Sequence, residues 1–185
     1  RRAEFADKVR TEAEKLNCIV ESLSKMVKLE QNIDGFEVED TKIRQTILDA
    51  VDMIYDKLEK KDIRLTMEPF EDMQLYHNRR WTAEVFVNLL ENAVKYTEKD
   101  GSISIRVRPY ELYTEIQIAD NGRGIRREEL TDIFRRFYRS PEVENVEGSG
   151  IGLYLSNLIL EKEKGYITVV SEYGKGSCFS VFLQN

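Results

Sequence analysis

Apolar side chains recur at steps of three and four residues along the first 32 residues, where neither glycine nor proline interrupts the pattern. This spacing predicts one long amphipathic helix whose other faces carry Arg, Lys and Glu. Such a helix is marginal in water, so we expect it to pack against a partner helix; the alternative is that it folds back on its own domain. The apolar positions are Phe5, Val9, Ala13, Leu16, Ile19, Val20, Leu23, Met26, Val27 and Ile33.

Beyond Gly35, short runs with period two alternate with longer runs of helical period. The runs predict strands at 36–38, 63–67, 73–76, 102–108, 112–119, 166–171 and 177–183, and helices at 41–60, 79–96 and 151–164. The helix at 41–60 has an expected core face of Ile43, Ile47, Leu48, Val51, Ile54, Tyr55 and Leu58. We predict an α+β fold, a two-layer α/β sandwich. Its mixed, largely antiparallel sheet is covered on one face by helices, and the long N-terminal helix precedes it.

Composition and charge narrow the classes of partner. The formal net charge of −6 argues against a nucleic-acid partner. Cys18 and Cys178 lie far apart without CxxC spacing, which argues against a zinc site or a disulfide framework and suits a reducing cytosol. No apolar run approaches the roughly 20 residues that span a bilayer. We therefore expect a cytoplasmic location and no membrane contact by residues 1–185.

Two asparagines lie one helical turn apart in the sequence NLLENAVKYT, residues 88–97. Asn88 and Asn92 share one stripe of the predicted helix, and a buried amide is costly unless its polar atoms find partners. Amide oxygens are neutral, hard ligands that suit a Mg²⁺ ion already carrying phosphate oxygens. The alternative is that both amides cap backbone groups of a neighbouring loop.

Two glycine-rich segments follow. Asp120-Asn-Gly122-Arg-Gly124 comes at the end of a predicted strand, where a carboxylate can accept from an exocyclic amine such as that of adenine; an ordinary turn is the alternative. Gly148-Ser-Gly150-Ile-Gly152 runs into a helix, so its N–H groups suit phosphate, although a plain loop-to-helix cap has the same composition. No GK[ST] follows, so this segment is not a Walker loop.

Taken in this order, the asparagine helix, the DxGxG segment, an Arg-rich stretch and the GxGxG segment resemble the ATP-binding domain of the GHKL superfamily. More narrowly, they resemble the catalytic domain of bacterial sensor histidine kinases. This narrowing rests on residues 88–97, on Ile133–Arg139, which match that family's phenylalanine box, and on 171–179, which match its last glycine box. The resemblance covers residues 36–185.

The resemblance divides the chain in two. The N-terminal helix is similar to the second helix of the dimerisation and phosphoacceptor domain, so residues 1–34 are expected to be a helical remnant of that domain. Residues 35–185 are expected to be the catalytic ATP-binding domain, with an ATP lid at about 121–150. The only histidine, His77, lacks the sequence context of a phosphoacceptor and is interpreted as a loop or capping residue.

The resemblance also implies roles for individual residues. Asn92 would bind Mg²⁺, and Asn88 would support the metal or the phosphates. Asp120 would fix the base, and Lys95 would place an ammonium group near the phosphates. Phe134 and Phe137 would pack the lid, or dock it on helices outside this chain. With Arg139, the lid arginine expected to stabilise charge on the γ-phosphate, Asn88 and Lys95 are the candidate catalytic residues. The remaining candidate ATP-binding residues are Tyr96, Gly122, Gly124, Ile125, Tyr138, Gly148, Ser149, Gly150, Ile151, Gly152 and Leu153.

The expected function is ATP-dependent phosphorylation of a protein histidine that lies outside this chain. ATPases of the wider superfamily are expected to carry a Glu at the position of Asn88; a neutral amide leaves no base for water and favours phosphotransfer. Alternatives are a GHKL-type conformational ATPase, a serine kinase of the anti-sigma type, and a non-catalytic nucleotide-binding dimerisation module. The implied partners are a response regulator and, in the full-length protein, a second copy. Membrane anchoring is expected through segments upstream of residue 1.

Overall fold

The computed structural model describes residues 2–33, 35–140 and 148–185. The helices are α1 (Arg2–Glu30), α2 (Ile43–Lys60), α3 (Arg79–Tyr96) and α4 (Gly152–Lys162), with a short 3-10 helix η1 (Arg127–Glu129). The strands are β1 (Glu39–Lys42), β2 (Arg64–Met67), β3 (Gln74–His77), β4 (Ser102–Pro109), β5 (Tyr113–Asp120), β6 (Tyr166–Glu172) and β7 (Gly176–Gln184).

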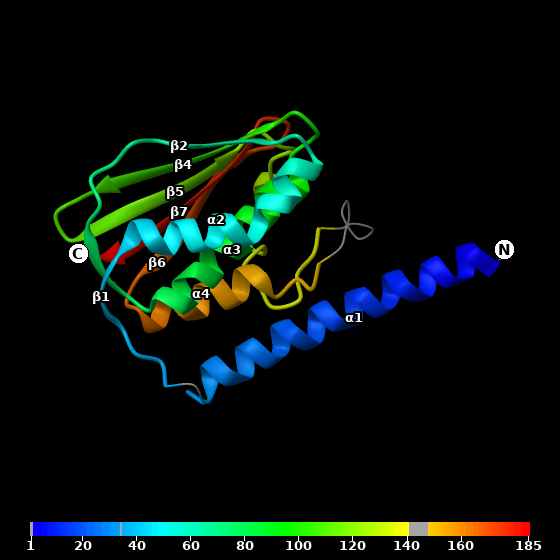
Figure 1. Cartoon of the computed structure of the whole chain (residues 1–185), viewed down its shortest axis with the longest axis horizontal. Helices are drawn as coiled ribbons and strands as arrows, with labels where there is room; N and C mark the ends of the chain where they lie inside the picture. The colour runs from blue at the N-terminus through cyan, green and yellow to red at the C-terminus, as the bar shows by residue number, and fades with distance from the viewer. Residues whose placement is uncertain (1, 34, 141–147) are drawn as a thin grey trace.

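The strands form one mixed sheet in the order β1-β3-β7-β5-β4-β2, with β6 also paired to β7. All pairs are antiparallel except β2 with β4. Helices α2, α3 and α4 lie together on one face of this sheet (Figure 1). The predicted two-layer architecture is therefore confirmed, and β4 and β5 form an antiparallel hairpin.

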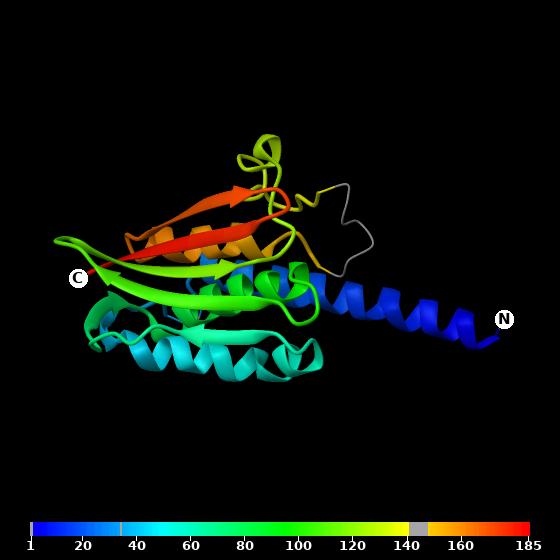
Figure 2. The ribbon, with the colours of Figure 1, turned by 90° about the horizontal axis from the view of Figure 1, so that it is seen from above.

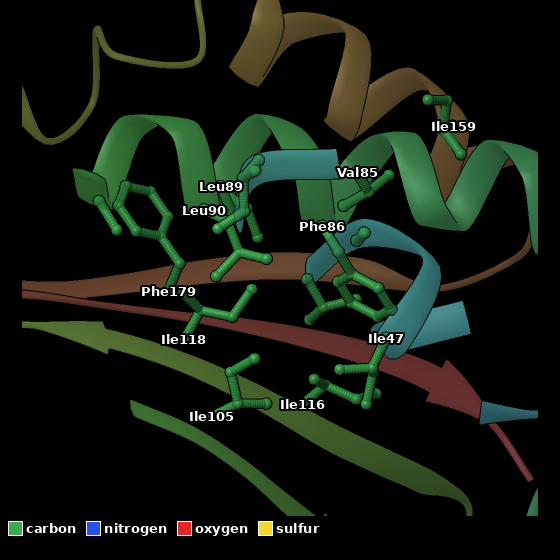
Figure 3. Packing of buried hydrophobic residues seen from close by; sticks show 14 of the residues in the cluster. Ile47, Val85, Phe86, Leu89, Leu90, Ile105, Ile116, Ile118, Ile159 and Phe179 are labelled. Atoms are coloured by element: carbon green, nitrogen blue, oxygen red, sulfur yellow. The ribbon is translucent and has the colours of Figure 1, made fainter. Parts of the chain in front are cut away.

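The core lies between α3 and the central strands. One face of α3 contributes the fully buried side chains of Phe86, Leu89 and Leu90, which pack towards Ile116 and Ile118 of β5 (Figure 3). The three α3 residues are three and four positions apart, and the two β5 residues are two positions apart. These spacings place the side chains on one face of a helix and on one face of a strand, respectively. This packing fixes the helix that carries both asparagines.

Both ends of α3 are held by specific contacts. At its start, the Oδ1 atom of Asn78 accepts a hydrogen bond from the backbone N–H of Trp81 at 3.0 Å, as a helix N-cap does. At its end, the Nζ atom of Lys61 donates to the carbonyl oxygens of Val94, Lys95 and Thr97, at 2.9, 3.1 and 3.0 Å. A cation there satisfies carbonyls that the helix leaves without partners.

Helix α1 extends well beyond the body of the molecule at its N-terminal end (Figures 1 and 2). Its C-terminal half packs on α4 and buries Met26 and Leu29, while Nζ of Lys25 lies 2.6 Å from a carboxylate oxygen of Glu84 in α3. The C-terminal half of α1 therefore folds onto its own chain. A second face stays exposed and carries an apolar stripe of Phe5, Val9, Leu16, Val20 and Val27. Packing of this stripe on a partner helix stays a prediction.

Two predicted element positions were wrong. Residues 36–38 do not form a strand: Phe36 instead lies near Trp81, with ring centroids 6.4 Å apart, and the strand is the polar segment β1 that follows. Because Thr41 and Lys42 belong to β1, α2 begins at Ile43 rather than at Thr41. A polar edge strand has no apolar alternation, so the sequence pattern could not reveal it.

Two side-chain assignments were also wrong. Tyr55, placed on the core face of α2, is 53% exposed, whereas Thr46 and Ala50 are buried there. His77 is neither a loop nor a capping residue, because it ends β3 with a fully buried ring. Its Nδ1 atom lies 2.9 Å from the carbonyl oxygen of Leu75 and its Nε2 atom 2.8 Å from the hydroxyl of Thr46. Burial lowers the pKa of His77, and a phosphoryl donor cannot reach the ring.

Candidate functional site

The C-terminal half of α3 is the centre of the candidate site, because the two glycine-rich segments both contact it. The Nδ2 atom of Asn88 donates to the carbonyl oxygen of Gly152 and to the hydroxyl of Ser156, each at 3.3 Å. Nζ of Lys95 lies only 2.6 Å from where a Cβ atom on Gly148 would be. The backbone N–H of Arg123 donates to the carbonyl oxygen of Tyr96 at 3.1 Å.

Asp120 ends β5 beside this helix terminus. Its Oδ1 atom accepts a hydrogen bond from the backbone N–H of Gly122 at 2.8 Å. Burial raises the pKa of Asp120, while the N–H groups of Gly122 and Ser177 act in the opposite direction because they stabilise the carboxylate. A partly buried carboxylate held by backbone donors is suited to accept one further hydrogen bond from a ligand amine.

Gly124 fixes the path of the chain after Asp120. Its φ of +69° is favourable for glycine, and a Cβ there would lie 2.1 Å from the carbonyl oxygen of Glu172. The next residue, Ile125, donates its N–H to the hydroxyl of Ser171 at 2.8 Å. The start of the predicted lid is therefore attached to the β6–β7 hairpin.

The rest of the predicted lid is anchored at two further points. The backbone N–H of Phe137 donates to the carbonyl oxygen of Gly150 at 2.9 Å, and the hydroxyl of Tyr138 donates to a carboxylate oxygen of Glu129 at 3.2 Å. Burial and the nearby Glu129 raise the pKa of Tyr138. Arg139 is partly buried next to Tyr138. Residues 141–147 of the predicted lid lie outside the described residues.

The two phenylalanines expected to pack the lid behave differently. Phe134 is partly buried and packs against the hydrophobic core, whereas the side chain of Phe137 is 52% exposed. The prediction that Phe137 packs within the lid is therefore wrong. The other predicted role, docking on helices outside this chain, stays a prediction for this residue.

The segment at 148–152 joins three elements. Ser149 Oγ accepts from the backbone N–H of Ile151 at 3.2 Å and lies 3.3 Å from the hydroxyl of Ser22 in α1. The side chain of Ile151 is fully buried and that of Leu153 packs against the core. These two predicted binding residues therefore face the protein interior, and only their backbone groups are placed to meet a ligand.

The two asparagines have different surroundings. The amide of Asn88 links α3 to the first turn of α4, rather than to the backbone of a loop. The amide of Asn92 is partly exposed and makes no hydrogen bond with any residue in the described parts of the chain. Over those same parts, no cluster of three or more His, Cys, Asp or Glu side chains could hold a metal ion. A cation here would have to take most of its ligands from a bound anion.

The Asn88 contacts give a stability prediction. Replacing Asn88 with glutamate is expected to cost about 1–3 kcal/mol of unfolding free energy, because it removes both donors and turns a carboxylate towards the carbonyl oxygen of Gly152. The matched control is Asn92→Glu, one turn on, where no hydrogen bond is lost. Urea titration followed by circular dichroism checks this. Equal midpoints for the two variants would contradict the Asn88 link.

Some residues at the site carried no sequence signal. Lys61 holds the end of α3, and Ser22 reaches Ser149 across 127 positions of the chain. Arg123 lies over the ring of Tyr96, with its guanidinium carbon 5.8 Å from the ring centroid. All three act through contacts between distant segments, and no local spacing or motif encodes such contacts.

Comparisons with known proteins agree with this geometry. Residues 77–185 match the family described as histidine kinase-, DNA gyrase B- and HSP90-like ATPase. The adaptive-response sensory-kinase SasA of Prochlorococcus marinus subsp. pastoris is 41% identical over 113 residues, 60% of this chain and 30% of SasA. The sensor protein kinase PmrB of Pseudomonas aeruginosa is 37% identical over 124 residues, 66% of this chain and 26% of PmrB. The chain thus spans less than a third of the length of these relatives.

Solved structures show the same fold. The histidine kinase AdeS of Acinetobacter baumannii superimposes with a TM-score of 0.76 at 21% identity, covering 96% of this chain and 82% of AdeS. Within the residues that the structure describes, no helix is long and apolar enough to cross a membrane. The matching family covers more than half of the chain, including α3 and both glycine-rich segments. The chain therefore belongs to the family of histidine kinase-, DNA gyrase B- and HSP90-like ATPases, and its named homologues are sensor histidine kinases.

Proposed function

We propose that this chain is the catalytic part of a sensor histidine kinase, which binds Mg-ATP and transfers the γ-phosphoryl group to a histidine outside residues 1–185. The observation that carries the proposal is the meeting of three segments at the end of α3. Asp120, the Asn88–Lys95 face of α3 and the glycine-rich segment at 148–152 come together there although 64 positions separate Asn88 from Gly152.

The site offers complementary groups for the parts of a nucleotide. Asp120 would accept from the adenine amine, with Tyr96 beside it. Lys95 and the N–H groups at 148–152 would meet the phosphates, where a cation and helix N-terminal donors stabilise negative charge. The short approach of Lys95 to Gly148 supports this assignment, because it places the ammonium group against the same segment.

The residues present also fit a magnesium ion. The amide of Asn92, which makes no hydrogen bond within the described residues, would provide one hard oxygen ligand, and Mg²⁺ normally completes its shell with phosphate oxygens and water rather than with a protein cage. When bound, the ion would neutralise charge on the phosphates. Asn92 would hold it, and Arg139 would approach the γ-phosphate from the lid.

Transfer to a protein nucleophile is favoured over hydrolysis by the residue at position 88. Asn88 cannot act as a base, and its amide nitrogen is already committed to Gly152 and Ser156. Water would then lack a positioned proton acceptor, so bound ATP would await another nucleophile. The buried ring of His77 leaves that nucleophile to a residue outside this chain.

The proposal also covers the domain organisation, the partners and the location of the protein. Residues 1–34 would be the second helix of a dimerisation and phosphoacceptor domain, with its exposed apolar stripe packing on a second copy of the full-length protein. Residues 35–185 would be the catalytic domain, working in the cytoplasm with a response regulator as the next acceptor. Membrane anchoring would come from segments upstream of residue 1.

Calorimetric titration with a non-hydrolysable ATP analogue, with and without Mg²⁺, tests the site. We expect magnesium-dependent binding, a loss of that dependence in Asn92→Ala, and binding weakened by about tenfold in Asp120→Asn, which corresponds to one lost charged hydrogen bond. Asn157→Ala is the control, because its amide bonds only to Glu161 on the outer face of α4. A folded wild type that binds no nucleotide would overturn the proposal.

A further inference from the structure

A groove lies at the opposite edge of the sheet from the lid segment. Helix α2 and strand β2 form this edge, while residues 125–140 rise at the other side (Figure 2). The groove has a volume of about 500 Å³, within the range of binding pockets. Its lining residues are Val51, Tyr55, Leu58, Glu59, Asp62, Ile63 and Leu65. None of them belongs to the candidate nucleotide site.

The floor of the groove is apolar and its rim is acidic. Val51, Leu58, Ile63 and Leu65 supply aliphatic carbon, and the only charged lining groups are the carboxylates of Glu59 and Asp62. Exposed Asp52 lies on the same side of α2 as Glu59, about two helical turns earlier. The groove therefore presents negative potential around a hydrophobic floor.

The neighbouring cations offset only part of this charge. Lys61 is turned towards the end of α3, where it donates to three carbonyl oxygens. Arg64 is exposed, and strand alternation places it on the sheet face opposite to Leu65. Lys99 lies 3.1 Å from Asp62, but both side chains are more than half exposed, and ion pairs of that kind are weak.

Strand β2 adds backbone groups to the groove. It is the last strand on its side of the sheet and, within the described parts of the chain, pairs only with β4. The N–H groups of Arg64 and Glu68 point to β4, so those of Leu65 and Met67 point to the free edge. A free edge beside a side-chain pocket is the arrangement by which sheets accept an added strand.

From these features we infer that the α2–β2 groove binds an extended segment of a partner protein that carries a Lys or Arg two positions from an aliphatic residue. Residues two apart on a strand point to the same side, so the aliphatic side chain enters the floor while the cation meets Glu59 and Asp62. The segment runs along the free edge of β2 and uses the N–H groups of Leu65 and Met67. Charge complementarity selects this partner over an acidic one.

The test uses two blocked peptides on the full chain, acetyl-Thr-Val-Thr-Lys-Thr-Val-Thr-amide and its counterpart with Glu in place of Lys. Amide chemical shifts followed by NMR should move at residues 62–67 and along the groove side of α2 with the Lys peptide. We expect its affinity to exceed that of the Glu peptide by about fivefold, and the preference to weaken as salt is added. The same shifts with both peptides at equal affinity would overturn the charge argument.

Charge-reversal variants test whether Glu59 determines the preference between the two peptides. Glu59→Lys should reverse the preference between the two peptides. Glu161→Lys makes the same charge change on the exposed side of α4, outside the lining, and should leave the preference unchanged. An amide spectrum that keeps the wild-type dispersion shows that each variant is folded. Absence of shifts at 62–67 up to about 5 mM Lys peptide, or a preference that Glu59→Lys changes no more than Glu161→Lys does, would overturn the inference.

Discussion

Replacing Gly176 with alanine is expected to lower the unfolding free energy by about 3 kcal/mol. The residue has a φ of +112°, which costs any L side chain of order 1–3 kcal/mol. A Cβ there would also lie 2.0 Å from the carbonyl oxygen of Asp120, so β5 and β7 would have to separate. Because Asp120 stands at that contact, nucleotide binding should weaken as well.

Gly174 provides the matched control for this substitution. It also has a positive φ, of +85°, but nothing lies within 4 Å of a Cβ placed on it. Gly174→Ala should therefore show the backbone cost alone, about 1–2 kcal/mol. Urea denaturation of both variants separates the two contributions, and equal losses would show that the approach to Asp120 carries no cost.

The second large effect concerns Glu163, at the end of α4. Its side chain is fully buried; one oxygen accepts from the hydroxyl of Thr82 at 2.7 Å and from the N–H of Asn78 at 3.0 Å, and the other has no partner in the described parts of the chain. Burial raises the pKa of Glu163 from 4.5 to about 7. The folded chain thus keeps a proton that the unfolded chain releases.

The sign of the pH dependence follows from this difference. Between pH 4.5 and about pH 7 Glu163 holds more proton in the folded than in the unfolded state, so its contribution to stability should fall as pH rises, by at most about 3 kcal/mol, and level off above pH 7. Burial lowers the pKa of His77 and acts in the opposite direction below pH 6.5, so the contribution of Glu163 is read as the difference between the wild type and its variant. Glu163→Gln keeps an acceptor for Thr82 and Asn78 without the charge. The variant should lose this slope and be more stable than the wild type at pH 8.

Thermal and urea unfolding across pH 4.5–8 checks the Glu163 prediction. Glu161→Gln is the control, because Glu161 lies two residues earlier on the exposed side of α4 and its replacement should preserve the wild-type slope. A Glu163→Gln variant that retains the slope would mean that another group titrates with folding. The Asn92 substitution acts on nucleotide binding and is not expected to change the slope.

The sequence predicted those parts of the fold in which local signals and packing agree. Both ends of α3 were predicted correctly, since its apolar side chains recur at helical spacing and the stripe from Val85 to Val94 faces one sheet. The cap itself was assigned to His77, whereas the structure has Asn78 in that role. Strand β1 was missed because its residues are polar and only pairing with β3 makes it a strand. Tyr55 was misplaced because an aromatic side chain can line an open groove as readily as a core.

For the site, the order of the motifs predicted which segments would meet. It could not predict which atoms would bond, since those contacts join residues far apart in the chain. Asn88 is the clearest example, because its assigned role depended on a resemblance, whereas its observed partners are Gly152 and Ser156. The roles of Arg139 and Asn92 stay predictions that the binding experiments address.

Helix α1 has two faces with different surroundings. One face reaches the glycine-rich segment through Ser22, while the opposite side exposes the apolar stripe, for which we predict a second helix as partner. If two chains pair through this stripe and nucleotide occupies the site, both events act on the same helix, and thermodynamic reciprocity links them. If pairing changes nucleotide affinity by some factor, nucleotide must change the dimer dissociation constant by that same factor. Sedimentation at several nucleotide concentrations would then read out communication between the subunits without following any reaction.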